Sequence, residues 1–245
     1  MKLAVFLFFL SLPVAVPATT WGEVEVDDPI FEGKKCSVHE PASYGSYIYS
    51  WPSKYDQVFW PITEKNGIWF CEESGFTAFI GDFSEITDSE VEMIKDYLIN
   101  NPPQDSSIET QLAYLEKLYS FRVINDAFEN RLLRVLARWN QELGNLDKAN
   151  QYRKEALKGI ELSLEEKLDE NRNLEYLYLA ANYTRQFGDE KKSDHYLSQL
   201  RSLIEQVESE NAKGFAEYLK ELSLDTVYIK AAGALDPEVP ESLAQ

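Results

Sequence analysis

The chain has few of the residues that usually carry enzyme chemistry or metal binding. It contains two cysteines, Cys36 and Cys71, two histidines, His39 and His195, and 24 lysines and arginines against 42 aspartates and glutamates. So little histidine supports no Ser-His-Asp or Cys-His catalytic pair. The formal net charge of −18 repels the phosphates of nucleic acids and of anionic lipids. We therefore expect no nucleic-acid partner and no polybasic attachment to a membrane.

Long apolar runs are also scarce. The longest, residues 3–16, is shorter than the roughly 20 residues that a membrane-spanning helix needs. Lys2 precedes this run and the small residue Ala18 follows it, which is typical of a secretory signal peptide. The sequence thus predicts a signal peptide over residues 1–18, cleaved near Ala18. We expect an exported protein, periplasmic or extracellular, without a membrane span.

The next stretch, residues 19–85, is rich in aromatic side chains and turn formers. Residues 19–34 suit a leader or an edge strand, and residues 47–51 carry an aromatic side chain at every second position, as a half-buried strand does. Asn66-Gly67 predicts a hairpin turn, with residues 68–70 as the returning strand. We interpret residues 19–85 as a small aromatic β-module that resembles a ribbon.

After residue 85 the apolar residues follow helical spacing. Thr87 and Glu90 predict a capping box that opens a helix ending near Asn100, and Ser106 with Glu109 predicts the start of the next helix. Two helix pairs then follow, with these predicted inner positions: Leu132, Leu136, Trp139 and Leu143; Ala149, Tyr152, Ala156 and Ile160; Leu177, Ala180, Thr184 and Phe187; Ser193, Tyr196 and Leu200.

Each helix pair is broken by a glycine followed by a turn residue. Gly144-Asn145 and Gly188-Asp189 lie about 44 residues apart, against about 34 in a standard tetratricopeptide repeat. We infer a lengthened tetratricopeptide-like repeat. The sequence therefore predicts a mainly α fold, with a helical-repeat domain over residues 86–232 and a flexible tail over residues 233–245.

The two cysteines leave three states open. Cys36-x2-His39 and Cys71-x2-Ser74 have the spacing of a zinc ribbon that has lost one ligand. In that alternative Cys36, His39 and Cys71 hold zinc, and water completes the tetrahedron as in catalytic sites. In an oxidising compartment, however, two lone cysteines in one small module more often pair. We favour a Cys36–Cys71 disulfide over zinc, and over two free thiols.

The aromatic stretch also has two interpretations. Trp51, Trp60 and Trp69 can present ring faces to a sugar or a peptide. Alternatively they form the core of a module that has few aliphatic residues, since each buried ring contributes about 2–3 kcal/mol. The core interpretation is the simpler of the two.

Taken together, the motifs resemble the bacterial family known as domain of unknown function 2225, over roughly residues 33–205. The resemblance rests on these residues: Cys36 and His39 at the first knuckle, and Cys71, Ser74, Gly75, Phe76, Ala78, Asp82 and Phe83 at the second. His39 and Ser74 stand where that family has cysteines. The resemblance implies knuckles followed by tetratricopeptide-like helices, and it implies no particular activity.

These patterns predict a non-catalytic, exported protein-interaction or scaffold protein. Stacked helix pairs form surfaces that bind a peptide or a partner helix, so a protein or peptide partner is expected and a cofactor is not. The alternative is a periplasmic sugar- or peptide-binding protein, or a zinc enzyme, that uses the aromatic and Cys-His residues.

Overall fold

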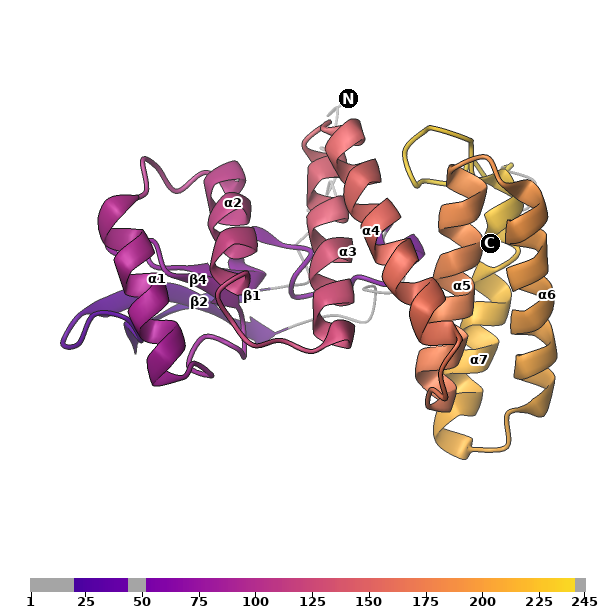
Figure 1. The fold of residues 1–245 in the computed structure, drawn as a ribbon, viewed down its shortest axis with the longest axis horizontal. Helices are drawn as coiled ribbons and strands as arrows, with labels where there is room; N and C mark the ends of the chain where they lie inside the picture. The colour runs from indigo at the N-terminus through magenta and orange to yellow at the C-terminus, as the bar shows by residue number, and fades with distance from the viewer. Residues whose placement is uncertain (1–19, 44–51, 241–245) are drawn as a thin grey trace, which may run out of the picture.

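The computed structural model describes residues 20–43 and 52–240, which form an elongated and mainly helical molecule (Figure 1). The predicted signal peptide and Trp51 lie outside the described residues. Helices α1 to α7 follow two small sheets in chain order. Among the described helices, none has an apolar stretch of the length that a bilayer requires.

Two antiparallel strand pairs form the N-terminal part. Strand β1 (Thr20–Asp27) pairs with β2 (Lys35–Ser43), and β3 (Ile68–Phe70) pairs with β4 (Thr77–Phe79). The β1 segment alternates in burial, as its Val-Glu-Val sequence dictates for a strand with one covered face. Of the two interpretations of residues 19–34, the edge strand is therefore the correct one.

The hairpin predicted at Asn66-Gly67 is wrong. Residues 65–67 form a short 3-10 turn, and the described partner of β3 is β4, which follows it in the chain. The reason for the glycine is close packing. A Cβ atom on Gly67 would lie 1.9 Å from the carbonyl oxygen of Pro61, so only glycine lets these two backbones approach.

Helices α1 (Asp88–Asn100) and α2 (Ile108–Tyr119) cover the strands. The predicted capping box at the start of α1 is confirmed, because the Thr87 side chain accepts the Glu90 N–H and Glu90 accepts the Thr87 N–H. The start of α2 differs by one residue. Ser107, not Ser106, is the N-cap, and its hydroxyl accepts the Thr110 N–H at 3.2 Å.

Glu90 joins α1 to the segment that precedes α3. Its Oε2 accepts the Thr87 N–H at 2.8 Å, and its Oε1 accepts the Val123 N–H at 2.7 Å. Burial of Glu90 by itself disfavours the charged form, but these hydrogen bonds to the carboxylate lower its pKa below the ordinary value.

Replacing Glu90 with alanine is expected to lower the free energy of unfolding by about 1–2 kcal/mol at pH 7, through loss of the cap and of the Val123 bond. The folded-state pKa of Glu90 is lower than its ordinary value of 4.5. Its contribution to stability is therefore present above about pH 4.5 and is lost as the pH falls through the folded-state pKa. Urea denaturation at pH 7 and pH 3 measures both effects. Glu92→Ala, exposed on the same helix, is the control. If Glu90→Ala lowered the free energy of unfolding equally at both pH values, the ionised carboxylate would not be the source of the stabilisation.

The remaining helices form two hairpins and a closing helix. The two predicted glycine breaks are confirmed, since Gly144 and Gly188 have φ angles of +80° and +83°. The positions predicted to face inward are mostly buried, including Leu136, Ala156 and Leu200. The helices are α3 (Asp126–Glu142), α4 (Leu146–Leu164), α5 (Glu170–Gln186), α6 (Glu190–Gln206) and α7 (Glu210–Leu222).

Two hydrophobic clusters run the length of the molecule. The first joins strand residues to α1, α2 and α3, so it crosses the predicted domain boundary at residue 85. The second lies among α4, α5, α6 and α7 and ends with Leu235, which is fully buried. The Leu235 N–H also donates to Gln141 Oε1 at 2.8 Å. The first residues of the predicted flexible tail are thus packed against the helices.

Candidate functional site

The predicted disulfide is formed. Cys36 in β2 and Cys71 just after β3 are both buried and bonded, with their Cα atoms 5.0 Å apart. The bond joins the two sheets, because each cysteine belongs to a different strand pair. Oδ2 of the buried Asp28 lies 3.4 Å from Cys71 Sγ, and its Oδ1 accepts the Ile30 N–H at 2.8 Å. A disulfide sulfur has no proton to donate, so the Asp28–Cys71 approach is a packing contact.

The alternative zinc set of Cys36, His39 and Cys71 is wrong. His39 is three residues from Cys36 in a strand, so the two side chains point to opposite faces. Among the described residues, the group whose ligand atoms converge is Asp28, Cys36 and Cys71, and the disulfide already uses both sulfurs. The knuckle interpretation failed because C-x2-H lies in an extended strand, whereas a zinc knuckle needs a turn.

Of the three tryptophans predicted as a ligand platform, the two that the structure describes pack against different aromatic side chains. Trp51 is outside the described residues. Trp69 is 9% exposed; it packs edge-on against Phe83 with ring centroids 5.4 Å apart and donates its indole N–H to the His39 carbonyl at 2.8 Å. Trp60 is half-buried, with its ring centroid 5.6 Å from that of Trp21. Trp69 therefore serves as core, and its indole N–H holds β2.

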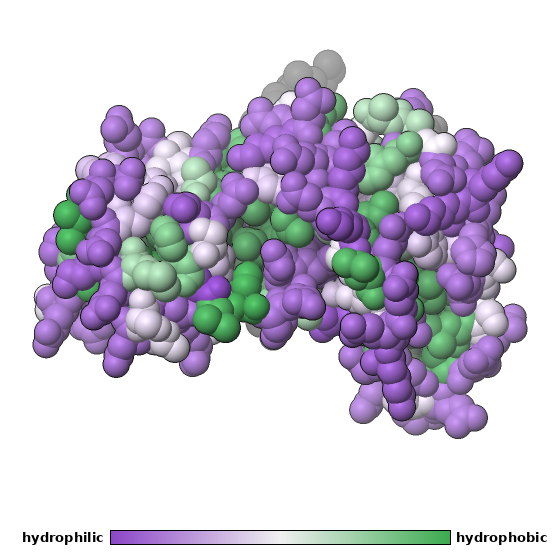
Figure 2. Space-filling view, viewed as in Figure 1, coloured by the Kyte–Doolittle hydropathy of each residue, from purple (hydrophilic) through white to green (hydrophobic). Residues whose placement is uncertain are grey.

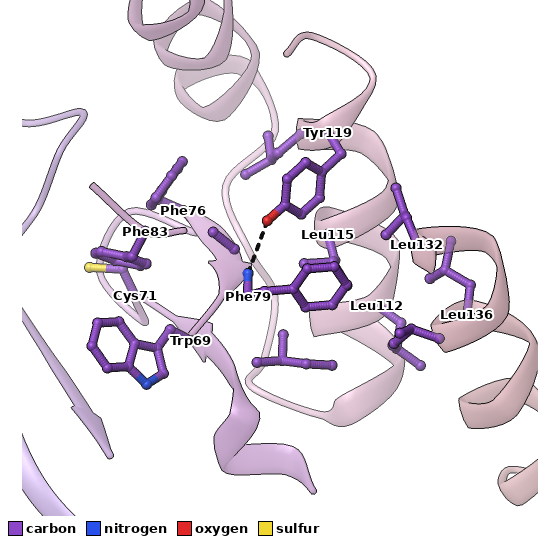
Figure 3. Close-up of a cluster of buried hydrophobic side chains, with 14 of the residues drawn as sticks. Trp69, Cys71, Phe76, Phe79, Phe83, Leu112, Leu115, Tyr119, Leu132 and Leu136 are labelled. Atoms are coloured by element: carbon purple, nitrogen blue, oxygen red, sulfur yellow. Dashed lines mark hydrogen bonds between the residues drawn. The ribbon is translucent and has the colours of Figure 1, made fainter. Parts of the chain in front are cut away.

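Figure 3 shows this aromatic core. Phe79 projects from the β3–β4 hairpin toward α2, where the Tyr119 hydroxyl accepts the Phe79 N–H at 3.1 Å. Phe76 lies on the other side of the strand and packs edge-on against Phe83, with ring centroids 4.9 Å apart. The same hydroxyl donates to Asp82 at 2.6 Å, and Asp82 pairs with Arg122 at 2.9 Å. Burial of Tyr119, with its hydrogen bond to Asp82, raises its pKa well above the ordinary value. These contacts place the aromatic motif in the core.

A buried polar cluster lies where residues 52–62 cross the helices. We call this segment the strap. It passes between the helix hairpins, as the short purple segment between α4 and α5 in Figure 1 shows. Helix side chains bind its backbone: Arg134 donates to the carbonyls of Asp56 and Gln57, both at 3.0 Å, and Asn182 donates to the Tyr55 carbonyl at 3.1 Å.

At the centre of the strap, Asp56 forms a bidentate ion pair with Arg153 of α4. The Nε–Oδ1 and Nη2–Oδ2 distances are 2.9 and 2.7 Å, and both side chains are 0% exposed. The Tyr183 hydroxyl donates to the same carboxylate at 2.9 Å. The pair thus has the fork geometry and the extra hydrogen bond that a buried ion pair needs to offset its desolvation.

The surroundings of the cluster favour the charged forms of its two arginines. Burial alone would lower the pKa of Arg153, but the Asp56 carboxylate raises it above the ordinary value. Burial would likewise lower the pKa of Arg134, but the Glu175 carboxylate lies 2.9 Å away and raises it above the ordinary value. Burial also raises the pKa of Tyr183, so this hydroxyl keeps its proton. No substrate reaches groups sealed at 0% exposure, so the cluster is suited to holding the strap.

Sequence reasoning missed this cluster, although two signals were present. Arg153 falls on the stripe of α4 that also carries Ala149, Ala156 and Ile160, where a cation is out of place unless it is paired. Asp56 interrupts an aromatic run between Tyr55 and Phe59 in the same way. A charge on an apolar face indicates a buried partner, but the pattern does not name that partner.

Grooves open to solvent occur elsewhere on the described surface. One, of about 690 Å³, lies among α4, α5 and α6 and includes His195, which is exposed as expected for a solvated helix position. A second, of about 450 Å³, lies between α3 and α4. A small third, of about 150 Å³, includes His39 and Trp69. These grooves, unlike the strap cluster, can receive a ligand.

No family model, curated protein or solved structure matches this chain.

Proposed function

We propose that this chain is an exported, non-catalytic protein-interaction protein. In this proposal, tetratricopeptide-like helix pairs and disulfide-linked strands form a rigid scaffold that presents an acidic surface to a protein partner. The mainly helical fold and the net charge of −18 support it. A buried disulfide and the lack of a spanning helix among the described residues are compatible with export.

The observation that carries the proposal is the contrast between interior and surface chemistry. The most closely associated ionisable groups, Asp56, Arg153 and Tyr183, are fully buried, and Arg153 and Tyr183 both bind the Asp56 carboxylate. The open grooves are instead lined by helical side chains, several of them acidic. Such an arrangement suits binding better than bond-making, because a reacting group must touch its substrate.

The strap changes where a partner is expected to dock. Helical arrays commonly bind extended segments on one face of the stacked helices. Here the helices already bind a segment of the chain itself, which is the strap. Arg134 and Asn182 donate hydrogen bonds to backbone carbonyls of the strap, as side chains of a helical array do to a bound peptide. The Asp56–Arg153 pair is too deeply buried to exchange readily. A partner is therefore expected on the outer grooves.

Capture from the organism's exported fraction tests the proposal. The intact protein, immobilised, is expected to retain a small set of basic proteins that elute as the salt concentration rises, since screening weakens contacts between exposed charges. The control is an unrelated acidic protein of similar net charge. Equal capture by both proteins, or turnover of a substrate by the purified chain, would contradict a specific non-catalytic interaction.

A further inference from the structure

The groove between α3 and α4 has the composition of a cation-binding surface. It lies between the first half of α3 and the second half of α4, where the molecular outline is notched in Figure 2. Four carboxylates line it: Asp126 and Glu129 from α3, Glu155 from the middle of α4, and Glu166 just beyond the end of α4. Lys158 is the single basic residue in this lining. We call this surface the acidic groove.

The carboxylates of the acidic groove are unneutralised. Within the described part of the chain, no ion pair involves any of the four, and their recorded side-chain contact is the Gln151 amide with Glu155 at 3.2 Å. The neighbouring groove is different. There Glu161 is paired with Lys192 at 2.8 Å and also accepts the Tyr196 hydroxyl at 3.2 Å. Glu161 of the neighbouring groove thus has a cationic partner, whereas none of the four carboxylates of the acidic groove has an ion pair among the described residues.

A buried acceptor supplies a second observation. Asn130, also in the lining, is 4% exposed, and its amide N–H donates to the Ala156 carbonyl at 2.8 Å. Its carbonyl Oδ1 has no hydrogen-bond partner. An unsatisfied acceptor costs free energy, which a donor from a ligand removes. A Cβ atom on Gly159 would lie 3.5 Å from Asn130 Nδ2, so this glycine lies directly beside the amide.

The spread of the acceptors favours a guanidinium over a metal ion. These carboxylates do not converge as metal ligands do, since among the described residues the convergent group is the one at Asp28. Arginine presents five donors in a planar fork and a long apolar stem. Leu162, 59% exposed, and Leu133 provide apolar surface beside the acids for such a stem.

We propose that the acidic groove binds an arginine-bearing segment of a basic protein partner, an inference that rests on the proposed function and names its surface. The guanidinium donates to the carboxylates and to Asn130 Oδ1, and the stem packs on Leu162.

A titration with defined peptides tests the acidic groove without the natural partner. The probe is acetyl-Leu-Arg-Gly-Arg-Leu-amide, and the matched control replaces both arginines with citrulline, which has nearly the same shape without the charge. Added to the isotope-labelled protein, the arginine peptide is expected to shift the Gly159 amide resonance and the Asn130 side-chain amide resonances. The citrulline peptide should leave them in place. Equal shifts with both peptides would overturn the proposal.

Two sets of variants locate the charge. Glu129→Gln, Glu155→Gln and Glu166→Gln together are expected to weaken binding about 10-fold, since each exposed pair contributes a modest share. The matched control, Glu92→Gln, Glu205→Gln and Glu208→Gln, makes the same change in net charge at exposed positions elsewhere and should stay within about two-fold. Equal weakening in both sets would show bulk attraction and would overturn the assignment to this groove.

A steric variant gives an independent check. Gly159→Leu fills the acidic groove without changing any charge, and a leucine there is expected to abolish the peptide-induced shifts while the rest of the spectrum stays native. Unchanged binding by this variant would place the peptide elsewhere.

The two proposals can fail separately. If the peptide fails to bind but specific proteins are still captured, the groove assignment is wrong and the proposed function stands. If the peptide binds but no protein is captured specifically, the acidic groove binds arginine as proposed and the proposed function is contradicted.

Discussion

Replacing Arg153 with methionine is expected to lower the free energy of unfolding by about 3–5 kcal/mol. The substitution leaves the Asp56 carboxylate uncompensated where both partners were 0% exposed. Methionine fills much of the same volume, so the loss reports the missing charge more than a cavity. Urea denaturation followed by tryptophan fluorescence measures it. The strap should also exchange its amide hydrogens faster, because its central anchor is gone.

Two further variants make this result interpretable. Arg201→Met, at an exposed position of α6, should change stability by less than about 0.5 kcal/mol. Asp56→Asn combined with Arg153→Met should be more stable than Arg153→Met alone, since the unpaired charge is removed and asparagine still accepts the Tyr183 hydroxyl. A loss below about 1 kcal/mol for Arg153→Met would show that the pair does not hold the strap.

Removing the disulfide is expected to cost about 3–4 kcal/mol of stability. Cys36 and Cys71 are 35 residues apart, and the chain-entropy model assigns roughly that amount to a loop of this length. The double variant Cys36→Ala/Cys71→Ala, compared with wild type in urea, measures the loss. Both positions are buried, so the small alanine side chains fit without overpacking.

Thiol titration provides the independent check on the disulfide. The native protein without reductant should show no reactive thiol, and the unfolded protein should show two after reduction. Metal analysis of the same sample should find no stoichiometric zinc, because a bonded sulfur cannot act as a thiolate ligand. Reactive thiols in the untreated protein, or one bound zinc per chain, would refute the disulfide.

Much of the fold was readable from local patterns. The capping box at Thr87 and the glycine breaks at 144 and 188 occur as predicted, and most of the predicted inner positions of α3 to α6 are buried. These features depend on residues within a few positions of one another, so the interacting residues can be recognised from a short stretch of sequence. The missed N-cap at Ser107 was an error of one residue between two adjacent serines with the same chemistry.

The predictions that failed depended on the path of the chain between distant residues. A zinc knuckle at Cys36 and His39 requires a turn, but pairing of β2 with β1 makes this segment extended and directs the two side chains to opposite faces. Gly67 was assigned to a hairpin, but its role is to admit Pro61. The same residue types suit both structures. Only the neighbouring segments decide between them.

By itself, the sequence determined the helix hairpins, because helical periodicity is local, and it favoured a disulfide between its two cysteines over zinc or free thiols. The tertiary structure brought the two sulfurs together. Tertiary structure alone chose Arg153 as the partner of Asp56, gave residues 52–62 their place between α4 and α5, and left the carboxylates between α3 and α4 without cations. With 42 acidic side chains and 24 basic ones, composition permits many pairings. Coulomb attraction and desolvation depend on distance and burial, and folding sets both.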